Sequence, residues 1–216
     1  YTRYAVSFAF LTAMLILLLF WNINSGSVHL SAGEIGKILA DQTGDSTAYH
    51  IVWDIRLPRI LAVVILGGAL SVSGFLLQTF FANPIAGPFV LGISSGAKLV
   101  VSLLMIFMLG KGMSVNSAAM ILAAFAGAMI SMGFVLLISG KVKKMSMLVI
   151  CGVMIGYICS AITDFAVTFA DDANIVNLHN WSMGSFSGMS WENIRVMTGV
   201  VLLSLFLVFL MAKPIS

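Results

Sequence analysis

The chain has 216 residues, of which 60% are hydrophobic and only 9% are charged, and its formal net charge is +3. A soluble domain carries roughly 25% charged residues, so the charges here are too few to cover a water-facing surface. This composition excludes a soluble enzyme, a nucleic-acid-binding protein and a secreted disulfide-rich domain. It indicates a protein embedded in a lipid bilayer.

Long uncharged runs predict six membrane-spanning helices. A helix needs about 20 predominantly apolar residues to cross a bilayer, and a helix is the only way for a single span to pair its backbone in lipid. We therefore expect an all-α fold, a polytopic transmembrane helical bundle. The predicted spans cover residues 5–21, 57–78, 90–109, 117–138, 146–167 and 194–212.

The segments between these spans carry local signals of their own. Ser31 and Glu34 form a capping-box pattern, which predicts the start of a short amphipathic helix. Residues 83–88 contain two prolines, which predict a tight reversal between the second and third spans because proline cannot continue a helix. A second short helix is expected near residues 173–180.

The charges and aromatic residues predict which way the chain enters the membrane. Lysine and arginine counts are equal on the two sides, but a compact lysine cluster in the loop at 139–145, which includes Lys143, favours a cytoplasmic loop. The four tryptophans are predicted at the opposite boundary, where amphipathic rings belong: Trp21, Trp53, Trp181 and Trp191. We therefore expect a cytoplasmic N-terminus.

Small residues recur every four positions in the fifth predicted span. The set lies on one face of the helix and consists of Gly152, Gly156, Ser160 and Asp164. One interpretation is a seam where helices pack closely. The other is that the stripe lines a passage, which Asp164 supports because ionisable groups at membrane depth usually face protein or water.

One segment matches a catalytic pattern. Residues 92–96 read G-x-S-x-G, as found around serine nucleophiles. A serine protease also needs a histidine base within reach, and none of His29, His50 and His179 lies inside a predicted span. We interpret the glycines and serines as tight packing at a helix start, and intramembrane proteolysis is disfavoured.

Arg56 and Arg59 flank Pro58, a residue favoured in the first turn of a helix. The two arginines are three residues apart and are therefore expected on about the same face. One interpretation is anchoring to lipid headgroups. The other is docking of a partner's carboxylates, because arginine binds a carboxylate through two parallel hydrogen bonds.

From Arg56 onward the sequence resembles the iron–siderophore and cobalamin permeases, the membrane subunits of type II ABC importers. The resemblance is carried by residues 56–62, 67–74, 78, 83–88, 91–97, 151–156 and 181–191. Gly87 departs from the family pattern, which usually has an acidic residue there.

The resemblance implies ten spans per subunit, of which six are present here. Residues 1–216 are then a single transmembrane permease domain that stops before the cytoplasmic coupling helices. The implied partners are a second permease subunit, a cytoplasmic ATPase dimer and an extracytoplasmic substrate-binding protein, in the bacterial cytoplasmic (inner) membrane. ATP and Mg²⁺ belong to the ATPase, since this chain has no G-x-x-x-x-G-K-[ST] phosphate loop; no catalytic residue, cofactor or metal site is expected in it.

The resemblance also implies a substrate and a set of roles. The expected ligand is a ferric siderophore moved inward by alternating access, with cobalamin or haem as alternatives. Arg56 and Arg59 would dock the binding protein, and the stripe from Gly152 to Asp164 would line the translocation path. The cytoplasmic gate is expected at Lys144, Met145 and Ser146.

An ion-coupled carrier or channel remains a rival of a different class. Such a protein usually buries several ionisable groups near the middle of the membrane. Only Lys98 and Asp164 come near that depth in the predicted spans.

Overall fold

The computed structural model describes residues 2–26, 28–40, 46–113, 115–142, 144–170 and 172–211. Lys143, which contributes to the predicted orientation, lies outside these ranges, as does the last residue of the sixth predicted span. No strand occurs within the described ranges.

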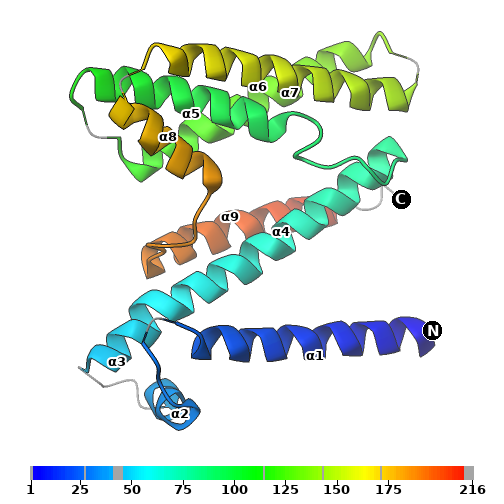
Figure 1. The fold of residues 1–216 in the computed structure, drawn as a ribbon. Helices are drawn as coiled ribbons and strands as arrows, with labels where there is room; N and C mark the ends of the chain where they lie inside the picture. Colours follow the sequence, from blue (N-terminus) through cyan, green and yellow to red (C-terminus); the bar gives the residue numbers. More distant parts are fainter. Residues whose placement is uncertain are drawn as a thin grey trace. The chain divides into compact units, whose positions relative to one another are not determined.

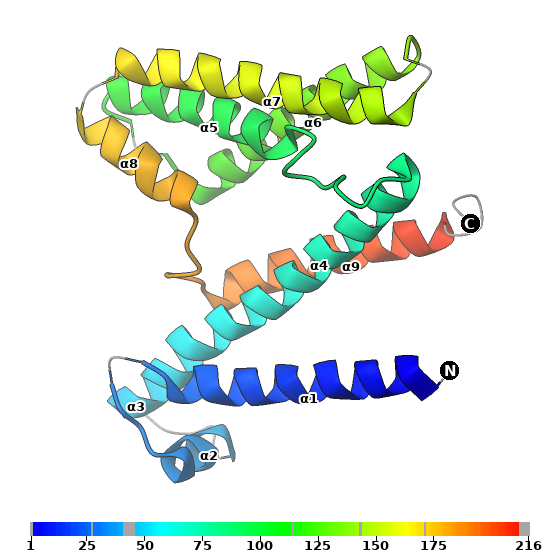
Figure 2. The same cartoon turned by 45° about the vertical axis from the view of Figure 1, so that its right-hand side comes forward.

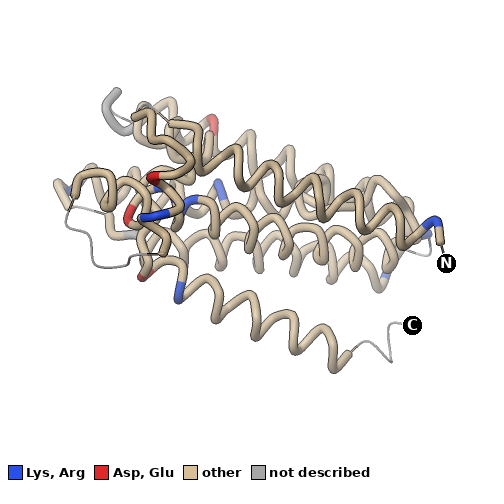
Figure 3. Tube along the Cα trace, turned by 90° about the horizontal axis from the view of Figure 1, so that it is seen from below, with Lys and Arg blue, Asp and Glu red and all other residues tan. Residues whose placement is uncertain are grey.

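Six helical stretches are long and apolar enough to cross a membrane, which confirms the six predicted spans. Most charged positions lie toward the ends of the helices, and long stretches between them carry no charge (Figure 3). The fold is therefore all-α and polytopic, as predicted. The long helices are α1 (Thr2–Asn24), α4 (Leu57–Phe81), α5 (Ile93–Gly110), α6 (Ser117–Ser139), α7 (Met145–Thr168) and α9 (Trp191–Leu210).

The described residues fall into two compact units, and the boundary between them lies inside α4. Unit 1 comprises Tyr1–Ala69 and Phe186–Ser216, and unit 2 comprises Leu70–Ser185. The ribbons in Figures 1 and 2 follow the chain through both units, which are described separately below.

In unit 2, α5 packs against both α6 and α7, and the shorter helix α8 (Asp172–Met183) packs on α5. Helix α8 confirms the short helix expected near residues 173–180. Both Figure 1 and Figure 2 show α5, α6 and α7 running alongside one another. A buried apolar cluster joins the reversal after α4 to α6 and α7: Phe81, Ala86, Leu91, Val135, Leu148 and Val149.

Unit 2 depends on two places where backbones meet without intervening side chains. Gly96 of α5 faces Gly127 of α6, and a Cβ added to Gly96 would lie 2.6 Å from the Gly127 carbonyl oxygen. Gly92 has φ +75°, a left-handed conformation suited to glycine, and an added Cβ would lie 2.7 Å from the Gly152 oxygen and from the Gly156 nitrogen. Glycine at these positions permits the close approach of the helices.

In unit 1, the short helix α2 (Ala32–Ala40) begins with the predicted capping box. The Ser31 backbone N–H and hydroxyl both donate to Glu34 Oε2 at 2.9 Å, and the Glu34 N–H donates to Ser31 Oγ at 3.3 Å. These hydrogen bonds, the backbone one first, lower the pKa of the Glu34 carboxyl. The cap therefore contributes stability at neutral pH, and that contribution is lost as the pH falls through the lowered pKa.

Unit 1 has a buried apolar cluster where α1 ends and α4 (Leu57–Phe81) begins. This cluster contains Ile23, Ile35, Val52 and Ile60. By contrast, every residue of α1 from position 2 to 18 is exposed, including Phe8 at 71% and Leu17 at 69%. A helix with so much exposed apolar surface is suited to lipid or to another protein chain.

The Gly96–Gly127 contact makes a prediction about stability. A Cβ added to Gly127 would overlap the Gly96 carbonyl oxygen, so Gly127→Ala forces α5 and α6 apart. We expect it to lower the free energy of unfolding by about 1–3 kcal/mol. The measurement is thermal unfolding of the purified full-length protein in detergent.

Gly133→Ala is the matched control, because Gly133 also lies in α6 and a Cβ there would meet nothing within 4 Å. We expect this variant to unfold at or slightly above the temperature of the unaltered protein, since alanine favours helix over glycine. Equal losses in the two variants would contradict the proposed close contact.

Candidate functional site

The segment from Trp53 to Arg59, called the α4 start, lies inside a longer helical stretch than predicted. Helix α3 (Thr47–His50) and a π-helical turn, η1 (Ile51–Arg56), lead without a break into α4. The Ser46 hydroxyl accepts from the Tyr49 N–H at 3.2 Å and caps the beginning of this stretch. The sequence predicts Pro58 at the start of a helix. In the structure Pro58 lies inside the helical stretch instead, where it interrupts the backbone hydrogen bonding.

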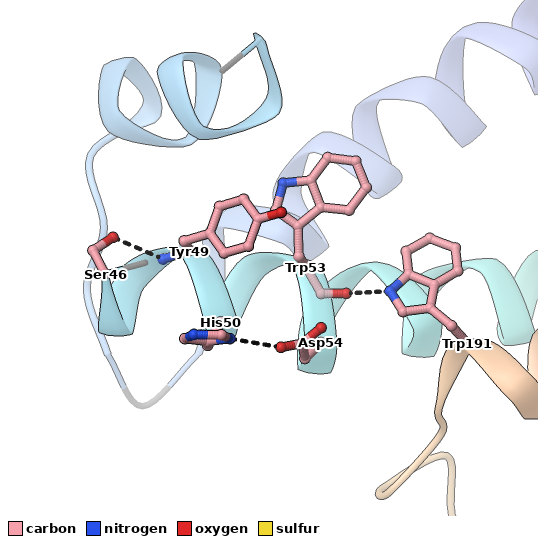
Figure 4. Close-up of polar contacts among 6 residues, drawn as sticks. All are labelled: Ser46, Tyr49, His50, Trp53, Asp54 and Trp191. Atoms are coloured by element: carbon pink, nitrogen blue, oxygen red, sulfur yellow. Dashed lines mark hydrogen bonds and ion pairs between the residues drawn. The ribbon is translucent and has the colours of Figure 1, made fainter. Parts of the chain in front are cut away.

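Pro58 and the π-helical turn together deprive the Trp53 carbonyl of a donor from its own helix. The Leu57 N–H, which would bond the Trp53 carbonyl in an α-helix, instead bonds the Val52 carbonyl. The next possible donor is residue 58, and proline has no N–H. The Trp53 carbonyl accepts instead from Nε1 of Trp191, the first residue of α9, at 2.9 Å (Figure 4).

Trp53 also connects the α4 start to α2. Its own Nε1 donates to the Ile38 carbonyl at 3.2 Å. Its ring lies 6.0 Å from the Trp191 ring and 6.1 Å from the Tyr49 ring, measured between centroids. One tryptophan thus holds together the start of α4, the start of α9 and α2. The sequence predicts Trp53 and Trp191 at a membrane boundary but does not predict this contact, for which the proline five residues after Trp53 is the available signal.

Arg56 points into the protein. Its side chain is only 8% exposed, and its Nη1 donates to the Ile23 carbonyl at 2.6 Å while Nη2 donates to the Val28 carbonyl. Ile23 lies in the last turn of α1, where carbonyls have no helical partner and a cation is favourable. Gly26 leaves room for the guanidinium, since a Cβ there would lie 2.5 Å from Nη2. Arg56 therefore joins α1 to the α4 start.

Arg59 is exposed, unlike Arg56. The two arginines therefore differ in exposure although they are only three residues apart, because the Arg56 guanidinium is occupied by main-chain carbonyls. The role of either residue in docking stays a prediction. Earlier in the same helical stretch, the His50 Nδ1 and Asp54 Oδ2 atoms lie 2.8 Å apart, with both side chains more than half exposed (Figure 4).

The stripe on α7 divides into a buried part and an accessible part. Gly152 and Gly156 are buried against residues 91–95, so in this chain they form the packing seam. Ser160 is half-buried and Asp164 is exposed. Only these last two are placed where a passing molecule could touch them, and their role in a path stays a prediction.

The predicted gate residues lie where α7 begins. Lys144 immediately precedes the helix, and Met145 and Ser146 form its first turn. All three are exposed. Among the residues that the structure describes, no group of His, Cys, Asp and Glu side chains could hold a metal ion.

The G-x-S-x-G segment has a packing role in the structure. Gly92 caps α5 and Gly96 meets α6, as described above. The Gly92 carbonyl accepts from the Ser131 hydroxyl of α6 at 2.9 Å. The glycines are thus explained by tight packing at a helix start, as the sequence predicts.

A comparison with known protein families gives a match over residues 14–216, to the FecCD transport family. The chain belongs to the FecCD transport family. The resemblance to iron–siderophore and cobalamin permeases is thereby confirmed at the level of the family.

The curated proteins similar to this chain include permeases named for vitamin B12 import. The vitamin B12 import system permease protein BtuC of Serratia proteamaculans (strain 568) is 38% identical over 165 residues, which cover 76% of this chain and 48% of that protein. BtuC of Escherichia coli O127:H6 is 38% identical over 172 residues, covering 80% and 52%. The chain spans about half the length of the curated relatives it matches.

A solved structure supports the fold. It shows a metal-chelate type ABC transporter in an inward-facing conformation, with a TM-score of 0.77 and 22% sequence identity. The match covers 100% of this chain and 64% of that one. At this identity the likeness establishes the fold and leaves the activity to other arguments.

Substitution of the two arginines should affect stability differently. Arg56→Gln removes charged donors from the Ile23 and Val28 carbonyls, and we expect it to lower the free energy of unfolding by about 1–3 kcal/mol. Arg59→Gln is the matched control and should leave stability within about 0.5 kcal/mol, since Arg59 is exposed. Thermal unfolding of the full-length protein measures both; equal effects would contradict the assignment.

Proposed function

We propose that this chain forms part of the membrane subunit of an ATP-driven importer of a large metal chelate. The observation that carries the proposal is the family match over residues 14–216, in a chain with six helices able to cross a membrane. ATP hydrolysis would occur on a separate cytoplasmic ATPase dimer, and the permease would only alternate its access between the two sides of the membrane.

The substrate class divides into two candidates. The two BtuC relatives carry names that refer to vitamin B12 import, which makes cobalamin the first candidate. A ferric siderophore, expected from the sequence, is the second, with haem as a further member of the same class of bulky chelates. The transporter of similar fold is of the metal-chelate type, a description that is compatible with each of these substrates.

Docking of an extracytoplasmic binding protein would depend on Arg59. Its exposed guanidinium can form two parallel hydrogen bonds with a carboxylate of the partner. Arg56 would act indirectly, because its contacts with the Ile23 and Val28 carbonyls hold the end of α1 beside the α4 start. In this arrangement Arg59 docks the partner, and Arg56 keeps the α4 start in place.

The remaining roles follow from exposure. A second permease subunit and lipid would cover the exposed apolar side chains of α1, such as Phe8. Ser160 and Asp164 on α7 are the candidates for the path, and the exposed start of α7 at Lys144–Ser146 is the candidate for the cytoplasmic gate.

Uptake in a deletion strain complemented with the full-length gene tests substrate and docking together. The substrates are labelled cobalamin, haem and ferric hydroxamate, catecholate and citrate chelates. We expect uptake of one chelate class, and a loss of about tenfold or more with Arg59→Glu, since a like charge at the docking surface weakens binding by at least 1.4 kcal/mol.

Lys37→Glu is the matched control, because Lys37 is an exposed cation on α2. It should leave uptake unchanged at equal protein levels. Uptake that survives Arg59→Glu would contradict docking at this residue and favour lipid anchoring. Uptake that persists without the ATPase would overturn the importer itself and favour an ion-coupled carrier.

A further inference from the structure

The Trp53 carbonyl stands at a point where the helix cannot supply its hydrogen bond. The Leu57 N–H is used by the Val52 carbonyl, and Pro58 has none to give. A carbonyl left unpaired away from water costs about 1–3 kcal/mol. The Trp53 carbonyl can therefore be paired only by a donor from outside its own helix.

That donor comes from a residue far away in the sequence. The Trp191 indole N–H reaches the Trp53 carbonyl at 2.9 Å, across a separation of 138 residues. Trp191 is half-buried, and its ring packs against the Trp53 ring at 6.0 Å between centroids. Trp21, by contrast, is 73% exposed, as expected of a residue that only anchors a helix at a membrane boundary.

The geometry points to Trp191 as a positioning residue for the α4 start, because its indole N–H replaces the backbone donor that Pro58 lacks. This hydrogen bond fixes the α4 start, which carries Arg59, against the start of α9. This inference rests on the proposed docking of a binding protein at Arg59. It assigns to α9 a part in docking that does not require contact between Trp191 and the partner.

The decisive variant is Trp191→Phe, which keeps an aromatic ring and removes the N–H. Uptake into vesicles containing the full-length permease and its ATPase is measured against the concentration of substrate-loaded binding protein. We expect the half-saturating concentration to rise roughly three- to tenfold, the equivalent of one net hydrogen bond. The maximal rate should change little, because a docked complex still transports. Trp21→Phe is the matched control and should change neither quantity.

Pro58→Ala provides the rescue. Alanine at position 58 has an N–H that can bond the Trp53 carbonyl in the π-helical register. If the turn reverts to α-helix, the Leu57 N–H serves instead. In either case the carbonyl is paired without Trp191, so Trp191→Phe should have a much smaller effect in the Pro58→Ala background. A double-mutant cycle over these two positions measures this coupling.

Indole N–H exchange with solvent gives an independent readout that does not depend on transport. In full-length protein labelled with ¹⁵N-tryptophan, the Trp191 N–H signal, assigned by its loss in Trp191→Phe, should exchange slowly and the Trp21 signal quickly. Fast exchange at Trp191 would overturn the inference whatever the uptake assay gives.

Arg59→Glu in the same vesicle assay separates the two proposals. If Arg59→Glu raises the half-saturating concentration and Trp191→Phe does not, only the role of Trp191 is overturned. If neither variant raises the half-saturating concentration, docking at the α4 start is overturned together with the inference. Equal effects of Trp191→Phe with and without Pro58→Ala would also contradict it.

Discussion

Pro58 has no backbone N–H, and the contacts of the α4 start depend on how the Trp53 carbonyl is paired without it. In the π-helical turn the Leu57 N–H donates to the Val52 carbonyl, and the Trp53 carbonyl accepts from the Trp191 indole N–H. Trp53 also donates through its own Nε1 to the Ile38 carbonyl, so the same residue contacts both α2 and α9. The same turn ends at Arg56, whose guanidinium holds the end of α1.

Unit 2 is held together differently, because its helices contact one another almost entirely through apolar and small residues. In lipid there is little hydrophobic gain in bringing two apolar helices together, so close packing of backbones has to supply the attraction. Gly96 with Gly127, and Gly92 with Gly152 and Gly156, provide that contact. The Ser131 hydroxyl adds a buried hydrogen bond to the Gly92 carbonyl.

Hydropathy and local patterns predicted the spans and the capping box at Ser31, because both depend on neighbouring residues. They did not predict the direction of Arg56 or the bond from Trp191 to Trp53. Those features depend on contacts across 33 and 138 residues, which no local pattern contains. The stripe on α7 shows the same limit, since spacing placed Gly156 and Asp164 on one face while burial separates them.

In the proposed function, α1, α2 and α9 hold the α4 start in place, and the exposed Arg59 would meet a partner. The most direct test of this function is transport by purified full-length permease with its ATPase in lipid vesicles, with binding protein and labelled cobalamin or ferric chelate on the side opposite the ATPase. The account predicts accumulation that requires both ATP and the binding protein. Accumulation driven by an ion gradient without ATP would contradict it.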